Sequence, residues 1–317
     1  MTAFSFPSFS LARWRGGLLG LLLWLVVSAV FGQSLPAATI TGQVLDQASR
    51  RPLGFVSVGV LRQPFGTVAD AQGRFQLSLP ASYDGDSVRF SLISYASRTL
   101  RVADLRRAVA AGPLVLRAQA VPLTEAHVKA KNLKRRVAGS TGTAIRFDGF
   151  PANMAGNQIG QVIAVKKPAF LEDISWHLFS CTYDTVYFRL NIYKLRDDYP
   201  AENILPRSVY LKVSRQQAQE QLSLDLRPFH LYLTENVVVS LELVRSLGTG
   251  ELWFRQPLLG GGPHYRLEQT PGPGTVLNTV PRSTDTHDLR QSQPGGPWTK
   301  FLKIGAGINA TLLQLPE

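Results

Sequence analysis

The sequence predicts an all-β protein made of a small seven-stranded Greek-key sandwich followed by a larger, jelly-roll-like β-sandwich. Three observations support this prediction. Short apolar stretches with a period of two are separated by Gly, Pro, Asn and Asp, which is typical of strands and turns. Hydrophobic residues make up 44% and charged residues 18% of the sequence, as in globular proteins. A chain of 317 residues is also long enough for two domains.

The chain begins with a segment that is typical of a secretory signal peptide. Arg13 and Arg15 precede the apolar run 18–31, which is shorter than the roughly 20 residues of a transmembrane helix. The pattern predicts a signal peptide over residues 1–32, with Gln33 as the new N-terminus, and an uncleaved anchor is the alternative. No later segment has the length of a membrane span. We therefore expect an exported protein, in the periplasm or at the outer-membrane or cell surface of a Gram-negative bacterium.

The net charge of +12 is at first sight typical of a protein that binds nucleic acid. Export argues against that partner, because exported proteins rarely meet nucleic acid. Arg13 and Arg15 are the charged residues of the leader, so its removal lowers the net charge to +10. The charge then favours anionic glycans or envelope proteins as partners, or simply solubility. The oligomeric state stays open.

The first sandwich is predicted over residues 38–117. Its seven strands are expected near 40–44, 56–60, 66–69, 75–79, 88–92, 95–102 and 114–116. The turn that starts at Asp70 has a physical reason, because an Asp side chain accepts the backbone N–H two residues on and Gly73 supplies a positive φ. Phe75 then enters the core. We interpret Asp70, Gly73 and Phe75 as a structural turn and not as a catalytic group.

Six short motifs occur in register within this segment. They are Ile40-Thr41-Gly42-Gln43-Val44, Asp46…Pro52-Leu53, Val56-Ser57-Val58, Gly66-Thr67-Val68-Ala69-Asp70, Gly73-Arg74-Phe75 and Asp86-Ser87-Val88-Arg89-Phe90…Ser94-Tyr95. In this order they closely resemble the carboxypeptidase-regulatory-like, transthyretin-like domain that is common in exported proteins of Bacteroidetes. The resemblance implies a non-catalytic β-sandwich accessory domain.

Residues 118–143 are predicted to be a basic linker between the two sandwiches. Five cations gather in it: Lys129, Lys131, Lys134, Arg135 and Arg136. Such a cluster can contact an anionic partner, a glycan or a membrane, or it can simply keep a linker solvated. The linker interpretation is favoured, and the anionic partner stays open.

The second sandwich is predicted over residues 144–317. Eight strands are expected near 159–165, 170–179, 186–195, 208–213, 222–226, 237–244, 251–254 and 308–313. Much of this region resembles the part that follows the same accessory domain in other exported Bacteroidetes proteins, a family of unsettled activity. The matching pieces include Lys167-Pro168-Ala169-Phe170-Leu171 and Phe188-Arg189-Leu190-Asn191-Ile192-Tyr193. The stretch 268–297, with five Pro and four Gly, is predicted to be an inserted loop.

No motif of a known catalytic centre is found in the sequence. None of the five histidines has Glu three residues on, as a zinc carboxypeptidase needs, and no Gly-x-Ser-x-Gly elbow occurs. Cys181 lies in an apolar stretch, where a free cysteine is usually a core residue. We therefore expect no enzyme and no cofactor. The expected function is an exported non-catalytic binding or structural module of the cell envelope; the alternatives are a carbohydrate-binding module of a glycan-uptake system and a cryptic glycan-active enzyme.

Two sets of residues stay open as binding candidates. Trp298, Tyr183 and Tyr265 are placed by the pattern near loop edges, where an aromatic ring can stack on a sugar. Trp176 and Trp253 lie in apolar strands and are expected in the core. The loop acids Asp197, Asp198 and Glu202 can offer oxygen ligands to Ca²⁺, although they lack a calcium-loop spacing and can equally be solvated.

Overall fold

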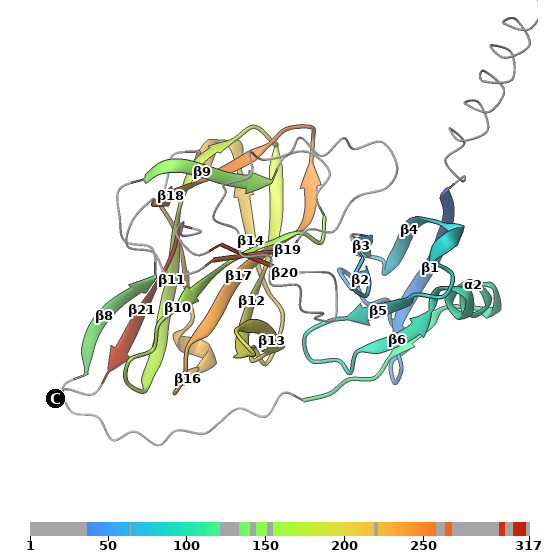
Figure 1. Ribbon diagram of the computed structural model, residues 1–317, viewed down its shortest axis with the longest axis horizontal. Coiled ribbons are helices and arrows are strands. Elements are labelled where there is room, and N and C mark those ends of the chain that lie inside the picture. The colour runs from blue at the N-terminus through green and yellow to red at the C-terminus, as the bar shows by residue number, and fades with distance from the viewer. Residues whose placement is uncertain are drawn as a thin grey trace, which may run out of the picture. The chain divides into compact units, whose positions relative to one another are not determined.

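The structure is a computed structural model that describes residues 37–63, 65–120, 133–139, 144–150, 155–218, 221–257, 264–267, 298–301 and 307–314 (Figure 1). The chain divides into Met1–Ala37 and a second unit, Ala38–Glu317. The second unit contains both β-sandwiches, and the all-β prediction is confirmed.

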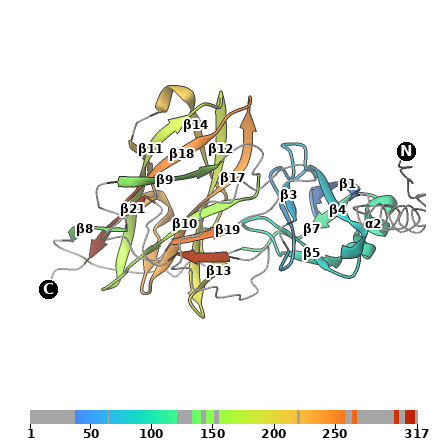
Figure 2. The same ribbon diagram turned by 45° about the horizontal axis from the view of Figure 1, so that its top comes forward.

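The first sandwich consists of a four-stranded sheet, in the order β3-β2-β5-β6, and a three-stranded sheet, in the order β4-β1-β7. The three strands of the smaller sheet are labelled in Figure 2. Its seven strands match the seven expected. They are β1 (Ala37–Asp46), β2 (Ser57–Val60), β3 (Gly66–Val68), β4 (Arg74–Pro80), β5 (Ser87–Ser91), β6 (Arg98–Arg101) and β7 (Leu114–Leu116). Strands β1 and β7 pair in parallel, whereas β2 pairs antiparallel with β3 and with β5.

Helix α2 (Val102–Ala111) connects β6 to β7, where the sequence pattern predicted a strand that continues through Val102. Its buried residues are Val102 and Leu105, three positions apart on one face of the helix. Gly112, with a φ of 146°, ends the helix, and Pro113 follows. The helix was not predicted because Val102 directly follows the alternating residues of β6, and the spacing between Val102 and Leu105 alone does not mark a helix. Short 3-10 turns also occur, at Ala81–Tyr83, Arg215–Gln217 and Arg227–Phe229.

The second sandwich contains two seven-stranded sheets. One has the order β13-β12-β17-β10-β19-β20, with β14 also paired to β12; the other has the order β8-β21-β11-β18-β9, with β15 and β16 also paired to β11. The strands of the first are β10 (Gln158–Ile163), β12 (Thr185–Arg196), β13 (Tyr199–Asn203), β14 (Val209–Ser214), β17 (Val237–Leu247), β19 (His264–Leu267) and β20 (Trp298–Phe301). Those of the second are β8 (Lys134–Gly139), β9 (Ala144–Phe150), β11 (Ala169–Cys181), β15 (Gln221–Asp225), β16 (Tyr232–Leu233), β18 (Leu252–Pro257) and β21 (Ile308–Gln314).

Each sandwich has its own hydrophobic core. In the first, Phe75 and Phe90 meet edge to face with ring centroids 5.2 Å apart. In the second, Phe150 packs on Phe188 and Phe254, and Trp176 is fully buried in the same core. Ile93 of the first sandwich packs against the core of the second, so apolar as well as polar contacts connect the two sandwiches.

All eight strands expected in the second sandwich are present, and six more were not expected. The predicted linker 118–143 was wrong at Lys134–Gly139, which forms β8 and pairs antiparallel with β21. Lys129, Lys131 and the predicted loop 268–297 lie outside the described residues. A run of Lys and Arg suggests a solvated linker, but it also suits an edge strand, because charged side chains protect an edge from unwanted pairing.

The turn at Asp70 joins β3 to β4 and shapes the first sandwich. The Asp70 carboxylate accepts the backbone N–H groups of Gln72 (2.9 Å) and Arg74 (2.8 Å). Gly73 has a φ of 72°, and a Cβ on it would lie 2.5 Å from the carbonyl oxygen of Val44. Phe75 directly afterwards is buried in the core. The Asp70 side chain therefore stabilises the turn through both of these hydrogen bonds.

We predict that Gly73→Ala destabilises the protein by more than about 1 kcal/mol, because the methyl group meets a backbone oxygen and the positive φ disfavours an L side chain. The urea dependence of unfolding, followed by circular dichroism, measures the effect. Gly85→Ala is the matched control, because a Cβ there meets nothing within 4 Å. Equal midpoints for the two variants would contradict the prediction.

Candidate functional site

The outer face of the sheet β10-β12-β17 carries a row of buried polar side chains. Along β12, Leu190 and Ile192 point into the core, so Arg189 and Asn191 point to the other face. On β17, Glu242 lies directly opposite Arg189 in the strand register. A polar face of a sheet is normally solvated, so its burial requires that another part of the protein covers it.

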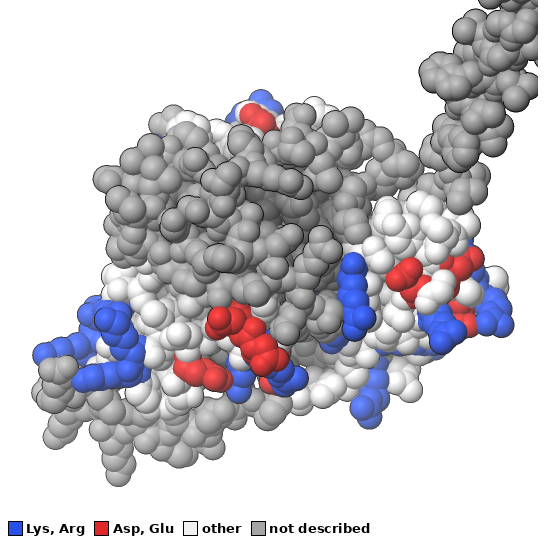
Figure 3. Space-filling model, viewed as in Figure 1, with Lys and Arg blue, Asp and Glu red and all other residues white. Residues whose placement is uncertain are grey.

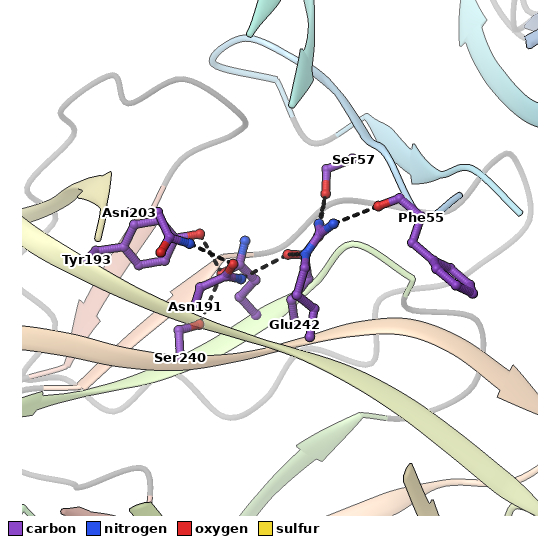
Figure 4. A network of polar contacts seen from close by, with 9 residues as sticks. Phe55, Ser57, Asn191, Tyr193, Asn203, Ser240 and Glu242 are labelled. Atoms are coloured by element: carbon purple, nitrogen blue, oxygen red, sulfur yellow. Dashed lines mark hydrogen bonds and ion pairs between the residues drawn. The ribbon is translucent and has the colours of Figure 1, made fainter. Parts of the chain in front are cut away.

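Arg189 joins the two sandwiches. Its guanidinium donates from Nε to Glu242 Oε2 (3.0 Å) and from Nη2 to Glu242 Oε1 (2.7 Å), and both side chains are 3% exposed. The same group donates from Nη1 to the carbonyl oxygen of Phe55 (2.6 Å) and from Nη2 to the hydroxyl of Ser57, which in turn donates to Glu242 Oε1 (2.6 Å) (Figure 4). A buried ion pair is tolerated only when its hydrogen bonds are satisfied, and here the first sandwich supplies part of them.

The network continues away from Arg189 across the same face. Asn191 donates from Nδ2 to Glu242 Oε2 (2.9 Å) and to Gln158 Oε1 (3.1 Å). Gln158 Oε1 also accepts the hydroxyls of Ser240 (3.0 Å) and Tyr193 (3.1 Å) (Figure 4). Burial, together with the nearby Glu242 carboxylate, raises the pKa of Tyr193 far above its usual value, so its hydroxyl stays a donor. Such a network favours one arrangement of the strands.

Two further contacts connect the sandwiches beside this network. The hydroxyl of Ser94, which follows β5, donates to the carbonyl oxygen of Pro206. The ring of Phe55 packs on that of Tyr210, with centroids 5.4 Å apart. Phe55 thus contributes both its carbonyl oxygen and its ring to the interface, and its φ of 60° is rare for a large side chain.

A second cluster of charges surrounds β8, where Lys and Arg side chains gather at one end of the face drawn in Figure 3. The sequence left open that Arg135 contacts an anionic partner, but in the structure its guanidinium is paired with a carboxylate. It donates from Nε and Nη2 to both carboxylate oxygens of Glu172, at 2.8 and 2.7 Å. These bonds hold the pKa of the Glu172 carboxyl below its usual value, against the effect of burial. Lys134 and Arg136 lie on the same strand.

We predict that Arg135→Met lowers the free energy of unfolding only slightly at neutral pH, because Arg135 itself is 69% exposed and water screens the ion pair. The folded-state pKa of Glu172 lies below its unfolded value, so the stabilisation is present above the unfolded pKa. It disappears as the pH falls through the folded-state pKa. Urea unfolding at a series of pH values, with Lys134→Met as control, measures this. A difference between wild type and Arg135→Met that does not change with pH would contradict it.

The three aromatic candidates for glycan contact are not equivalent. Tyr183 was expected near an exposed loop edge, but it is 1% exposed and belongs to the core of the second sandwich. Burial raises its pKa to about 12, and it is removed as a glycan contact. Tyr265 lies on β19 and Trp298 on β20, two strands that pair antiparallel with each other. Their side chains lie outside the described part of the structure.

Asp197 and Asp198 form the two-residue turn between β12 and β13, each with a positive φ, and Glu202 lies on β13. This is the geometry of a tight hairpin, which explains two acids in a row without a metal ion. In the described part of the chain, no three His, Cys, Asp or Glu side chains gather as a metal site needs. Cys181 is buried, and burial raises the pKa of its thiol. Among the described residues, no helix has the length and apolar character to cross a membrane.

The fold and the interface together define a class of protein: a small β-sandwich accessory module fixed to a larger β-sandwich. Comparison with protein families agrees. Residues 40–132 match the CarboxypepD_reg-like domain, a regulatory-like and not a catalytic family, and this part of the chain is therefore such a domain. The match ends later than residue 117, the predicted end of this sandwich.

Other comparisons give no further identification. No curated protein matches the chain. Among solved structures, it is similar to a chain of the T13 IBDV viral particle, with 8% identity, 89% of this chain and 63% of that chain covered and a TM-score of 0.22. A chain of the infectious bursal disease virus Gt strain follows, with 9% identity, 89% and 64% coverage and a TM-score of 0.20. The protein spans less than two thirds of the length of either viral chain, and nothing follows from such low scores.

Proposed function

We propose that this protein is an exported, non-catalytic module of the cell envelope of a Gram-negative bacterium, in which the two sandwiches act as one rigid structural or binding unit. The observation that carries the proposal is Arg189, a buried cation whose hydrogen bonds are divided between Glu242 of the second sandwich and Phe55 and Ser57 of the first. The accessory domain is thereby part of the second sandwich's surface and not an independent tethered unit.

Three further observations support the proposal. The leader-like pattern of residues 1–32 supports export. The matched family is regulatory-like, which supports a non-catalytic role. The buried polar side chains of the Arg189 network are bonded to one another, which favours a structural role over reaction with a substrate.

Export is tested by expressing the full chain in a Gram-negative host and fractionating the cells. We expect the protein in the envelope or periplasmic fraction, with Gln33 as the N-terminal residue by mass spectrometry. Leu22→Glu, which places a charge in the apolar run, should keep the protein in the cytoplasm, whereas the matched Leu22→Ile should not. An intact chain that still starts at Met1 and stays in the cytoplasm would refute the proposal.

A further inference from the structure

A groove of about 870 Å³, lined by both polar and apolar side chains, lies beside the Arg189 network and is formed by both sandwiches. The first sandwich contributes strands β1 and β4 and the turn between β3 and β4. The second contributes the end of β17, with Val244 and Arg245, three residues or fewer beyond Glu242. The volume is that of a site for a small or medium-sized ligand.

The groove carries positive charge. Arg74 and Arg245 both line it, and both are exposed. Neither guanidinium forms a salt bridge with any residue that the structure describes. The one acid among the lining residues, Asp70, already accepts the backbone N–H groups of Gln72 and Arg74. A ligand with negative charge therefore meets two guanidinium groups, each of which can bind a carboxylate or sulfate through two hydrogen bonds.

The other polar groups of the groove suit hydroxyl groups. Gln43, Gln72 and Gln76 line it together with Thr41 and Thr67. A primary amide offers both donors and an acceptor, and a threonine hydroxyl does the same, so this lining matches the alternating donors and acceptors of a sugar. An acidic peptide can use the same two arginines, and its backbone can pair with the same amides, so the test below includes one as the competing ligand.

Phe55 connects the groove to the junction of the two sandwiches. It lines the groove, its N–H donates to the carbonyl oxygens of Ala69 and Asp70 (3.2 and 3.3 Å), and its carbonyl oxygen accepts from Arg189. The walls of the groove are therefore held in place by the same contacts that hold the sandwiches together. A ligand finds a preformed site and does not have to order it.

We propose that this groove binds an anionic oligosaccharide, one that carries carboxylate or sulfate groups, with Arg74 and Arg245 as the residues that contact its charges. The proposal rests on the proposed function, because it names the ligand class of that binding module.

The test is isothermal titration calorimetry of the mature chain, residues 33–317, with oligogalacturonate as the probe. We expect saturable binding that weakens as salt is added. The double variant Arg74→Gln/Arg245→Gln should bind at least about tenfold more weakly, which corresponds to about 1.4 kcal/mol. The double variant Arg51→Gln/Arg117→Gln is the matched control, because it removes two exposed arginines of the first sandwich that lie outside the groove.

Each outcome decides the proposal. Loss of affinity in the groove variant alone supports it. Equal losses in the two double variants would assign binding to net charge and overturn it, as would the absence of binding. If poly-L-glutamate binds as tightly as oligogalacturonate and depends on the same two arginines, the ligand is an acidic peptide and the glycan assignment fails. The export experiment is independent of all these outcomes, so failure of the site and failure of the proposed function are distinguishable.

Discussion

Arg189→Met is expected to lower the free energy of unfolding by about 3–5 kcal/mol, because it leaves the Glu242 carboxylate buried without its partner. Urea unfolding followed by circular dichroism gives the value. The matched control is Arg215→Met, which breaks an ion pair with Asp184 in which both side chains are more than 60% exposed. That pair should contribute no more than about 1 kcal/mol.

A double variant separates the charge effect from the loss of packing. Arg189→Met/Glu242→Leu removes both charges and should be less destabilised than Arg189→Met alone, because no carboxylate is left unpaired. If Arg189→Met unfolds at the same urea concentration as Arg215→Met, the interface does not depend on Arg189 and the rigid junction is refuted. If the double variant is no more stable than the single one, the cost comes from lost hydrogen bonds to Phe55 and Ser57.

Trp176→Ala should destabilise the protein by about 3–5 kcal/mol, because the indole ring is 0% exposed in the core of the second sandwich and its removal leaves a cavity. Thermal and urea unfolding, followed by circular dichroism so that the signal does not depend on tryptophan, measure the loss. Leu247→Ala is the control, since Leu247 is 37% exposed on β17 and its truncation should change stability by about 0.5 kcal/mol or less. Similar stabilities of the two variants would contradict the core position of Trp176.

The fold class and most strands are predictable because each depends on local pattern. Val186, Phe188, Leu190 and Ile192 alternate with other residues and mark β12 directly. Strand β13 was missed because it contains Pro200 and follows a turn of two aspartates, without the Asn-Gly or Gly that usually marks a hairpin. Strand β8 was not predicted because its cluster of Lys and Arg residues is also typical of a solvated linker.

The site could not be predicted, for a physical reason. Arg189 and Glu242 alternate with apolar residues, which is the pattern of a solvated sheet face. Their direct pairing follows from the strand register, and their burial follows from contact with Phe55 and Ser57, more than 130 residues away in the sequence. The sequence does show that Arg189 and Glu242 each lie among the apolar residues that are typical of a buried strand. A single sequence does not show which charge meets which.

The shared hydrogen bonds of Arg189 also set a limit on how this protein can be rearranged during evolution. Accessory domains are commonly copied from one gene to another, and a transplanted domain must bring its own solvated surface. In another protein, a copy of the first sandwich would lack the Arg189 guanidinium that donates to its Phe55 carbonyl oxygen and Ser57 hydroxyl. The second sandwich without the first would expose Arg189 and Glu242 to water, whereas both are buried in the complete chain. Either sandwich on its own would therefore leave polar groups of this junction without the partners that they have in the complete chain.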